Sequence, residues 1–227
     1  MSKYSLPFIL CAQKFSLLFV LAFTTANASP LNETNSTVCS PLVGTCEYYD
    51  CVEKNLISCG ETGYTIGYGK FYCEKFKAVL PQPVFSNHER ELFPVDWHLW
   101  LQKTAICLHS AIDNHIATTE MQTCENLRNA AFKSHASCYT SDDSFCFLPP
   151  QQIAQIGGII SLRGFSQPET ILQVQQTANI CVQQFNNRIS VENSLQNKIE
   201  LTIYKNAWSL IAHDPEKSFQ DLQEKAQ

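Results

Sequence analysis

The chain has 227 residues, of which 44% are hydrophobic, so it is long enough to bury one sizeable core and is expected to form one domain. Its formal net charge is −5 and it contains no run of basic residues, which argues against a general nucleic-acid binder and against a binder of anionic membranes. Charged residues make up only 16% of the chain, below the roughly 25% of a typical soluble domain.

Residues 1–28 are predicted to be a signal peptide. Lys3 and Lys14 flank a mixed starting segment, an apolar run follows at 15–23, and Ala26-Asn27-Ala28 has the small-x-small pattern of a cleavage site. The run is shorter than the roughly 20 residues that cross a bilayer, and no later segment approaches that length. We therefore expect a secreted, extracellular protein without a membrane span. A bacterial periplasmic location stays open.

The cysteines support this expectation independently. Cys11 lies in the predicted signal, and ten cysteines follow it. An even number in a secreted chain predicts five disulfides and no free thiol. Each bridge stabilises such a fold by about 2–4 kcal/mol. Neither the count nor the spacing selects the pairing.

A polar lead at 29–38 precedes the first of these cysteines. Asn32 and Asn35 each begin an N-x-[ST] sequon, so both are candidate glycosylation sites if the source is eukaryotic.

The first half of the remaining chain predicts short helices. Residues 39–59 hold four cysteines and end at Gly60, a helix stop, and the glycines at 60, 63, 67 and 69 predict a loop. A short helix at 71–80 ends before Pro81. Beyond Pro94, apolar residues recur at three- and four-residue spacing from Trp97 to Ile112 and predict a stronger helix. Thr119 and Gln122 resemble a capping box that starts the next helix, and a link near 115–118 would make the two helices an antiparallel hairpin.

The second half is also predicted to be helical. A helix at 151–162 is expected to break at Gly157-Gly158 or at Gly164, and the next begins near 166–169 with Pro168 in its first turn. A further helix restarts near 190–192 and ends at 213–215. No segment alternates with a period of two, so the fold class is all-α, a disulfide-stapled helical domain over residues 39–213 with a charged flexible tail over 214–227.

The order and spacing of the ten cysteines resemble the stanniocalcins, secreted glycoprotein hormones tied to calcium and phosphate handling. The similarity extends from Cys39 to about His213 and includes local pieces around the cysteines. These pieces are Cys51-Val52-Glu53, Tyr72-Cys73, Cys138-Tyr139, and Ser194-Leu195 with Trp208-Ser209-Leu210 in the last helix.

The resemblance implies a disulfide pairing and a function. The pairs would be Cys39–Cys51, Cys46–Cys73, Cys59–Cys124, Cys107–Cys138 and Cys146–Cys181. The function would be signalling through an extracellular protein partner or receptor, with no catalytic residue, no cofactor and no metal. The chain lacks the family's cysteine near the end of the last helix and its internal sequon. A covalent homodimer is therefore not expected, while a non-covalent dimer held by the last helix around Ile203, Trp208 and Ile211 stays open.

Two alternatives from other classes remain. Thr65-Ile66-Gly67-Tyr68-Gly69 is similar to a strand of phage-type lysozymes, and a glycoside hydrolase needs a carboxylate pair, for which Asp50, Glu53 and Glu61 are the nearby candidates. The other alternative is an uncharacterised disulfide-rich secreted helical module.

Three weaker patterns receive structural interpretations. His109, Asp113 and His115 could approach one another on a helix, but the simpler interpretation is a helix end with cationic histidines. His213-Asp214 is interpreted as a helix end before Pro215. Trp97 and Trp100 are interpreted as core or interface aromatics.

Overall fold

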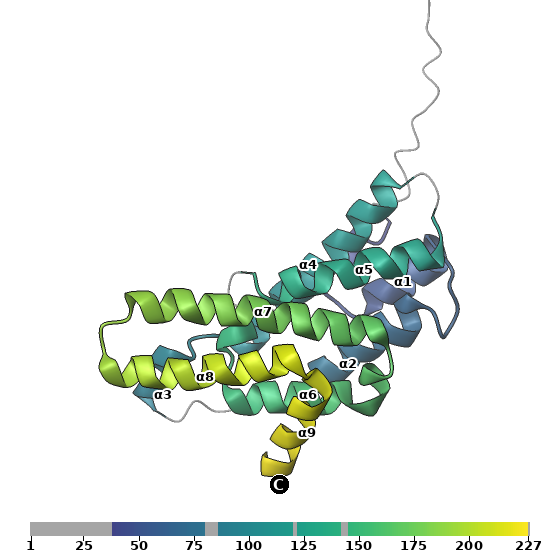
Figure 1. Ribbon diagram of the computed structural model, residues 1–227. Coiled ribbons are helices and arrows are strands. Elements are labelled where there is room, and N and C mark those ends of the chain that lie inside the picture. The colour runs from purple at the N-terminus through teal and green to yellow at the C-terminus, as the bar shows by residue number, and fades with distance from the viewer. Residues whose placement is uncertain (1–37, 80–85, 120–121, 142–144, 227) are drawn as a thin grey trace, which may run out of the picture. The chain divides into compact units, whose positions relative to one another are not determined.

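A computed structural model describes residues 38–79, 86–119, 122–141 and 145–226 (Figure 1). All of them belong to the unit Glu33–Gln227, and the other unit, Met1–Asn32, lies outside the described residues. The described part of the chain is helical and contains no β-strand, which confirms the all-α prediction. The predicted signal peptide, its cleavage site and both sequons lie outside the described residues.

The N-terminal region is a group of short helices packed around tyrosines. They are the 3-10 turn η1 (Ser40–Leu42), the helix α1 (Glu47–Asn55), the π-helical turn η2 (Tyr64–Lys70) and the helix α2 (Phe71–Lys77). Tyr48, Tyr64, Tyr68 and Tyr72 are buried in one cluster with residues of two later helices, among them Leu127. Burial of these large rings supplies much of the local driving force for packing.

The predicted glycine loop is wrong beyond Gly63. Residues 64–70 are helical because Tyr64, Tyr68 and Tyr72, each four residues from the next, present one apolar face to the core. Gly69 serves close packing instead of a turn, since a Cβ there would lie 2.4 Å from Cε1 of Tyr49. The predicted stop at Gly60 also falls late, because α1 ends at Asn55. Gly60 does have a left-handed φ of 76°, in the connection that follows α1.

The predicted helical hairpin is present. It consists of α4 (Trp97–Thr118) and α5 (Cys124–Tyr139), which pack on one another and are joined by Cys107–Cys138. Its link lies a few residues later than predicted, and the capping-box interpretation is wrong. The N-cap of α5 is Thr123, while the Gln122 side chain donates to backbone carbonyls at the end of α4, including that of Ile116 at 2.9 Å.

Five disulfides join the helices, and they are the same five pairs that the stanniocalcin resemblance implies. They are Cys39–Cys51, Cys46–Cys73, Cys59–Cys124, Cys107–Cys138 and Cys146–Cys181. The first three connect the short N-terminal helices to one another and to the start of α5. The last connects the 3-10 turn η3 (Phe145–Phe147) to α7 (Pro168–Val191).

The remaining helices build a second buried cluster. They are α3 (Asn87–Leu92), α6 (Pro150–Phe165), α7, α8 (Leu195–His213) and α9 (Pro215–Ala226). The long helices α7 and α8 lie side by side (Figure 1), and their buried faces meet at Phe185 and Leu201. Trp97 and Trp100 at the start of α4 belong to this cluster, which agrees with their interpretation as core aromatics.

Two further predictions in this half are corrected. The helix α6 continues through Gly157 and Gly158, so a break there is wrong, and it ends at Phe165, next to the alternative break at Gly164. Gly157 allows Phe219 of α9 to approach, because a Cβ there would lie 2.1 Å from Cδ1 of Phe219. The segment predicted as a flexible tail is helical over 215–226, and Phe219 is only 3% exposed. Asp214 starts α9 by accepting a hydrogen bond from the Lys217 N–H at 3.1 Å.

Candidate functional site

Glu53, one of the three carboxylates considered for a hydrolase, is engaged in hydrogen bonds to the segment that follows α1. Glu53 Oε1 accepts hydrogen bonds from the backbone N–H groups of Cys59 at 2.7 Å and Gly60 at 2.6 Å, and Oε2 accepts one from the Thr65 hydroxyl. Burial by itself would raise the pKa of Glu53, but these hydrogen bonds outweigh it and lower the pKa. A general acid needs the opposite shift. Glu53 therefore acts as a structural anchor for the connection between α1 and η2.

The other two carboxylates, Asp50 and Glu61, have different surroundings. Asp50 pairs with Lys70, with an Oδ2–Nζ distance of 2.8 Å, and Glu61 is exposed. None of the three carboxylates lines the interior cavities described below.

Of the three α4 residues interpreted as part of a helix end, His115 lies in the last turn, whereas His109 and Asp113 have a different role. His109 is fully buried, stacks on Tyr48 with ring centroids 4.0 Å apart, and accepts a hydrogen bond at Nδ1 from the Gly44 N–H at 2.9 Å. Burial lowers the pKa of His109 to about 4, so the ring is neutral at physiological pH and is not a cationic partner of the helix end.

The Tyr48 hydroxyl links His109 to Asp113. It donates to Asp113 Oδ1 at 2.5 Å and contacts the His109 carbonyl oxygen at 3.1 Å. Burial raises the pKa of Asp113, and the Tyr48 hydrogen bond partly offsets that shift. Within the described residues, no group of three His, Cys, Asp or Glu side chains is placed to hold a metal ion.

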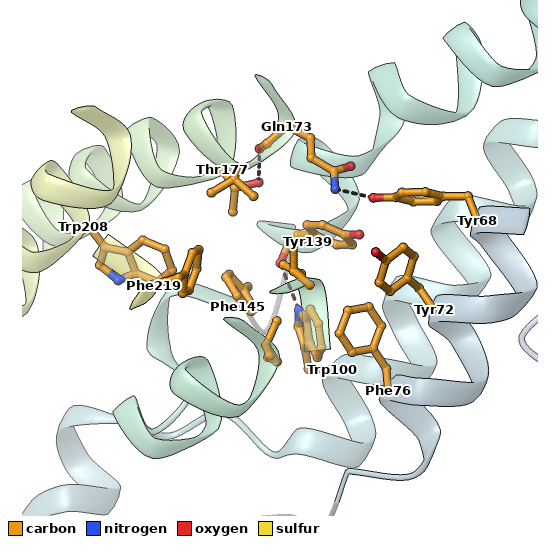
Figure 2. A pocket seen from close by; sticks show the side chains of 13 residues that line it. Tyr68, Tyr72, Phe76, Trp100, Tyr139, Phe145, Gln173, Thr177, Trp208 and Phe219 are labelled. Atoms are coloured by element: carbon orange, nitrogen blue, oxygen red, sulfur yellow. Dashed lines mark hydrogen bonds between the residues drawn. The ribbon is translucent and has the colours of Figure 1, made fainter. Parts of the chain in front are cut away.

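A second buried histidine forms the centre of a hydrogen-bonded chain that sequence analysis missed. His135 of α5 contacts the Gln173 Oε1 atom through Nδ1 and the Tyr64 hydroxyl through Nε2 at 3.1 Å. Gln173 Nε2 in turn donates to the Tyr68 hydroxyl at 2.8 Å (Figure 2). The carbonyl oxygen of Gln173 can only accept, so the proton of the neutral ring is assigned to Nδ1 and Tyr64 donates to Nε2. Burial lowers the pKa of His135 to about 4.

Two adjoining cavities lie beside this chain. The first, of about 40 Å³, has aromatic walls from η2, α2, α4, α5, η3, α8 and α9 (Figure 2). The second, of about 50 Å³, extends along α4 to Thr104 and His109. The two share five aromatic wall residues, which are Tyr68, Tyr72, Phe76, Trp100 and Tyr139. No local motif could have indicated them, because the walls come from segments up to about 150 positions apart in the chain, Tyr68 to Phe219.

The outer face of α8 carries an exposed apolar stripe, which we name the α8 stripe. Its members are Leu195 (73% exposed), Ile199 (51%), Ile203 (60%) and Leu210 (66%). At 3.6 residues per turn they fall within a sector of about 80°, over a length of about 22 Å. Of the three residues predicted to form a dimer surface, only Ile203 belongs to it.

The other two are buried in the core, so that part of the prediction is wrong. Trp208 is 5% exposed and Ile211 is 3% exposed. Both point to the opposite face of α8, toward the cluster that contains Phe145 and Phe219.

Comparison of the chain with models of known protein families, with curated proteins and with solved structures found no match. Fold and site together therefore define the class as an all-α, disulfide-rich protein. Within the part of the chain that the structure describes, no helix is both long enough and apolar enough to cross a bilayer.

Proposed function

We propose that this protein is a secreted, stanniocalcin-like signalling protein that acts by binding another extracellular protein. The observation that carries the proposal is the disulfide framework. Ten cysteines pair in the five combinations that the resemblance implies, although many other combinations were open to them. Such a framework suits an oxidising, extracellular environment. By the same resemblance, calcium and phosphate handling is the physiology in which to seek its effect.

The α8 stripe is the surface that we assign to this binding. Single exposed apolar residues are ordinary, but four exposed apolar side chains within one sector of a helix are typical of a docking surface. Lys198 and Lys205 lie seven residues apart along one edge of the stripe, both partly exposed. The expected partner therefore presents an apolar strip bordered by acidic residues, because opposite charges at the rim favour the correct docking orientation.

The experiment is a binding assay on cells from the protein's own organism. Labelled protein should bind saturably, and unlabelled protein should compete with it. The double substitution Ile203→Glu and Leu210→Glu should weaken binding by at least about tenfold, since it places two charges within the apolar contact. Leu172→Glu on α7 is the matched control, because Leu172 is likewise exposed (54%) but lies outside the stripe, and this variant should bind normally.

Other outcomes would overturn the proposal. Absence of saturable binding would refute the signalling function, and equal binding by both variants would refute the assignment of the stripe. Size measurements on the same proteins over a range of concentrations test whether a second copy of the chain binds the α8 stripe. If the wild type and the control dimerise and only the stripe variant does not, the second copy is the partner. Calcium and phosphate uptake by an epithelial cell layer, with and without added protein, tests the hormone-type role.

A further inference from the structure

The Cys59–Cys124 bridge occupies a different place in the fold from the other four disulfides. Cys39–Cys51 and Cys46–Cys73 lie within the group of short N-terminal helices, and Cys107–Cys138 lies within the hairpin of α4 and α5. Cys146–Cys181 joins η3 to α7. Among the described residues, Cys59–Cys124 is therefore the one disulfide that links the N-terminal group to the hairpin.

This bridge is also the most exposed of the five. Cys124 is exposed and Cys59 is half-buried. Each of the other four bridges has at least one buried cysteine; those that are only 0–5% exposed are Cys39, Cys46, Cys138, Cys146 and Cys181. Thiol–disulfide exchange requires a thiolate to reach a sulfur atom, so a bridge with a buried cysteine reacts more slowly than an exposed one.

The chain around Cys59 leaves room for an attacking thiol. Its neighbours Ser58 and Gly60 are both exposed, and a Cβ at Gly60 would have no heavy atom within 4 Å. Glu53 holds this segment by accepting hydrogen bonds from the N–H groups of Cys59 and Gly60. The Cys59 side of the bridge thus lies near the surface, in a segment that contacts other than the disulfide keep in place.

The Cys124 side favours departure of its sulfur as a thiolate. Cys124 is the first residue of α5, a helix of 16 residues whose N-cap is Thr123. The positive end of a helix dipole stabilises a thiolate at this position. Glu125 beside it acts in the opposite sense, but it is exposed, so that solvent screens its charge. The Glu53 carboxylate, 2.7 Å from the Cys59 nitrogen, disfavours a second negative charge on the Cys59 side.

We infer that Cys59–Cys124 is a site of thiol–disulfide exchange, reduced ahead of the other four bridges by a protein dithiol of the C-x-x-C class. A thiolate of the reductant attacks Cys59 Sγ, the S–S bond breaks, and its electron pair leaves on Cys124 Sγ, which takes up a proton. The second thiol of the reductant then attacks its own sulfur in the mixed disulfide and releases Cys59 as a thiol. Two electrons and two protons are transferred, so the reductant ends as a disulfide and the bridge as two thiols.

Reduction removes the covalent link without removing the contacts that pack the two parts together. Tyr64 and Tyr68 of η2 lie in one buried cluster with Leu127 and Phe132 of α5. The Tyr64 hydroxyl also bonds to His135 at 3.1 Å. The exchange therefore acts as a switch: the reduced protein stays folded, while the connection after α1 and the first turn of α5 gain freedom to move.

The test is a timed partial reduction of the full mature protein with thioredoxin, its reductase and NADPH. Samples are quenched with acid and alkylated, and mass spectrometry gives the labelling of each cysteine. Cys59 and Cys124 should be labelled at least about tenfold faster than any other cysteine. Reduced glutathione, as a second reagent, should cleave the same bridge and leave its adduct on Cys59. The ratio of the two rates shows whether a protein dithiol or a small thiol is the effective reductant.

Two double substitutions separate a switch from a purely structural bridge. The protein with Cys59→Ala and Cys124→Ala should stay folded at room temperature, with its melting temperature lowered by about 4–16 °C. Faster amide hydrogen exchange should be confined to residues 56–63 and the first turn of α5. Cys146→Ala with Cys181→Ala is the matched control, because that bridge is buried in the core, and its loss should speed exchange throughout the core helices.

Three results would overturn the inference. They are labelling of another bridge before or together with Cys59–Cys124, a glutathione adduct mainly on Cys124, and loss of the folded state when Cys59 and Cys124 are replaced. None of these results depends on the α8 stripe or on the signalling function.

Discussion

Acidification should destabilise this protein well above the pH at which carboxylates titrate. The cause is the pair of buried histidines, His109 and His135, whose pKa values burial lowers to about 4. Both rings are held neutral by partners that suit one tautomer: Gly44 donates to His109, and Tyr64 donates to His135. Protonation would place two hydrogens between Nε2 of His135 and the Tyr64 oxygen unless that hydroxyl turned away.

The sign and size of the effect follow from proton linkage. In the unfolded chain each imidazole has a pKa of about 6.5. Between pH 6.5 and 4 the unfolded state therefore binds a proton on each ring that the folded state does not, so stability falls as pH falls. The free energy of unfolding falls by about 1.4 kcal/mol per pH unit for each histidine, or about 3 kcal/mol per pH unit for both. By pH 4, each histidine has lowered the free energy of unfolding by about 3 kcal/mol. The whole free energy of unfolding of a typical domain is only about 5–15 kcal/mol.

The assay is denaturant unfolding at intervals of half a pH unit between pH 7.5 and 5. This window lies above the unfolded pKa of glutamate, so that the lowered pKa values of Glu53 and Glu169, which favour the fold above about pH 4.3, do not contribute to the slope. His135→Gln should lower stability at pH 7 and halve the slope below pH 6.5, and His109→Gln should do the same.

A flat stability profile between pH 6.5 and 5 would refute this reasoning. So would titration of both rings near pH 6.5 in the folded protein, followed by NMR.

Three other expectations concern packing and covalent structure. Glu53→Gln should destabilise the fold by about 1–3 kcal/mol, because charge-assisted hydrogen bonds are lost, and this should lower the melting temperature. Glu61→Gln, at an exposed site, is the control. If the wild-type protein clears peptidoglycan and Glu53→Gln abolishes this activity, the hydrolase alternative is favoured instead. Gly157→Ala should displace Phe219, lower the stability of the fold by about 1–3 kcal/mol and increase protease cleavage within α9. Gly158→Ala, at the neighbouring exposed position, should leave stability unchanged or raise it. Equal effects of the two substitutions would contradict the packing argument. Thiol titration of denatured, unreduced mature protein should find no free thiol, and a non-reducing gel should show a monomer band. Two or more free thiols would disprove the assignment of five disulfides.

The sequence was informative wherever a pattern repeats at helical spacing. The periodicity from Trp97 to Ile112 predicted α4 and its buried face, and Pro168 marked the first turn of α7. The pairing of the cysteines came from family resemblance, since spacing alone leaves many combinations. These features depend on short-range geometry or on an established framework.

The errors have a common physical origin in tertiary contacts. Gly69 and Gly157 looked like helix breakers, but each makes room for an aromatic ring that comes from elsewhere in the chain. The segment after His213 looked like a polar tail because Phe219 is a single apolar residue among charges, yet α6 buries it. The interior cavities were equally inaccessible to sequence reasoning, because no neighbouring residues define them.

The covalent framework ends at Cys181, and this divides the protein into parts with different connections. Among the described residues, each disulfide-closed loop lies between Cys39 and Cys181, whereas no described disulfide reaches α8 or α9, which noncovalent contacts such as those of Leu201 and Phe219 hold in place. Local opening of the C-terminal helical pair would therefore leave all five of these bridges intact. Such an opening would move Trp208 from the wall of the first inner cavity and carry the α8 stripe with it.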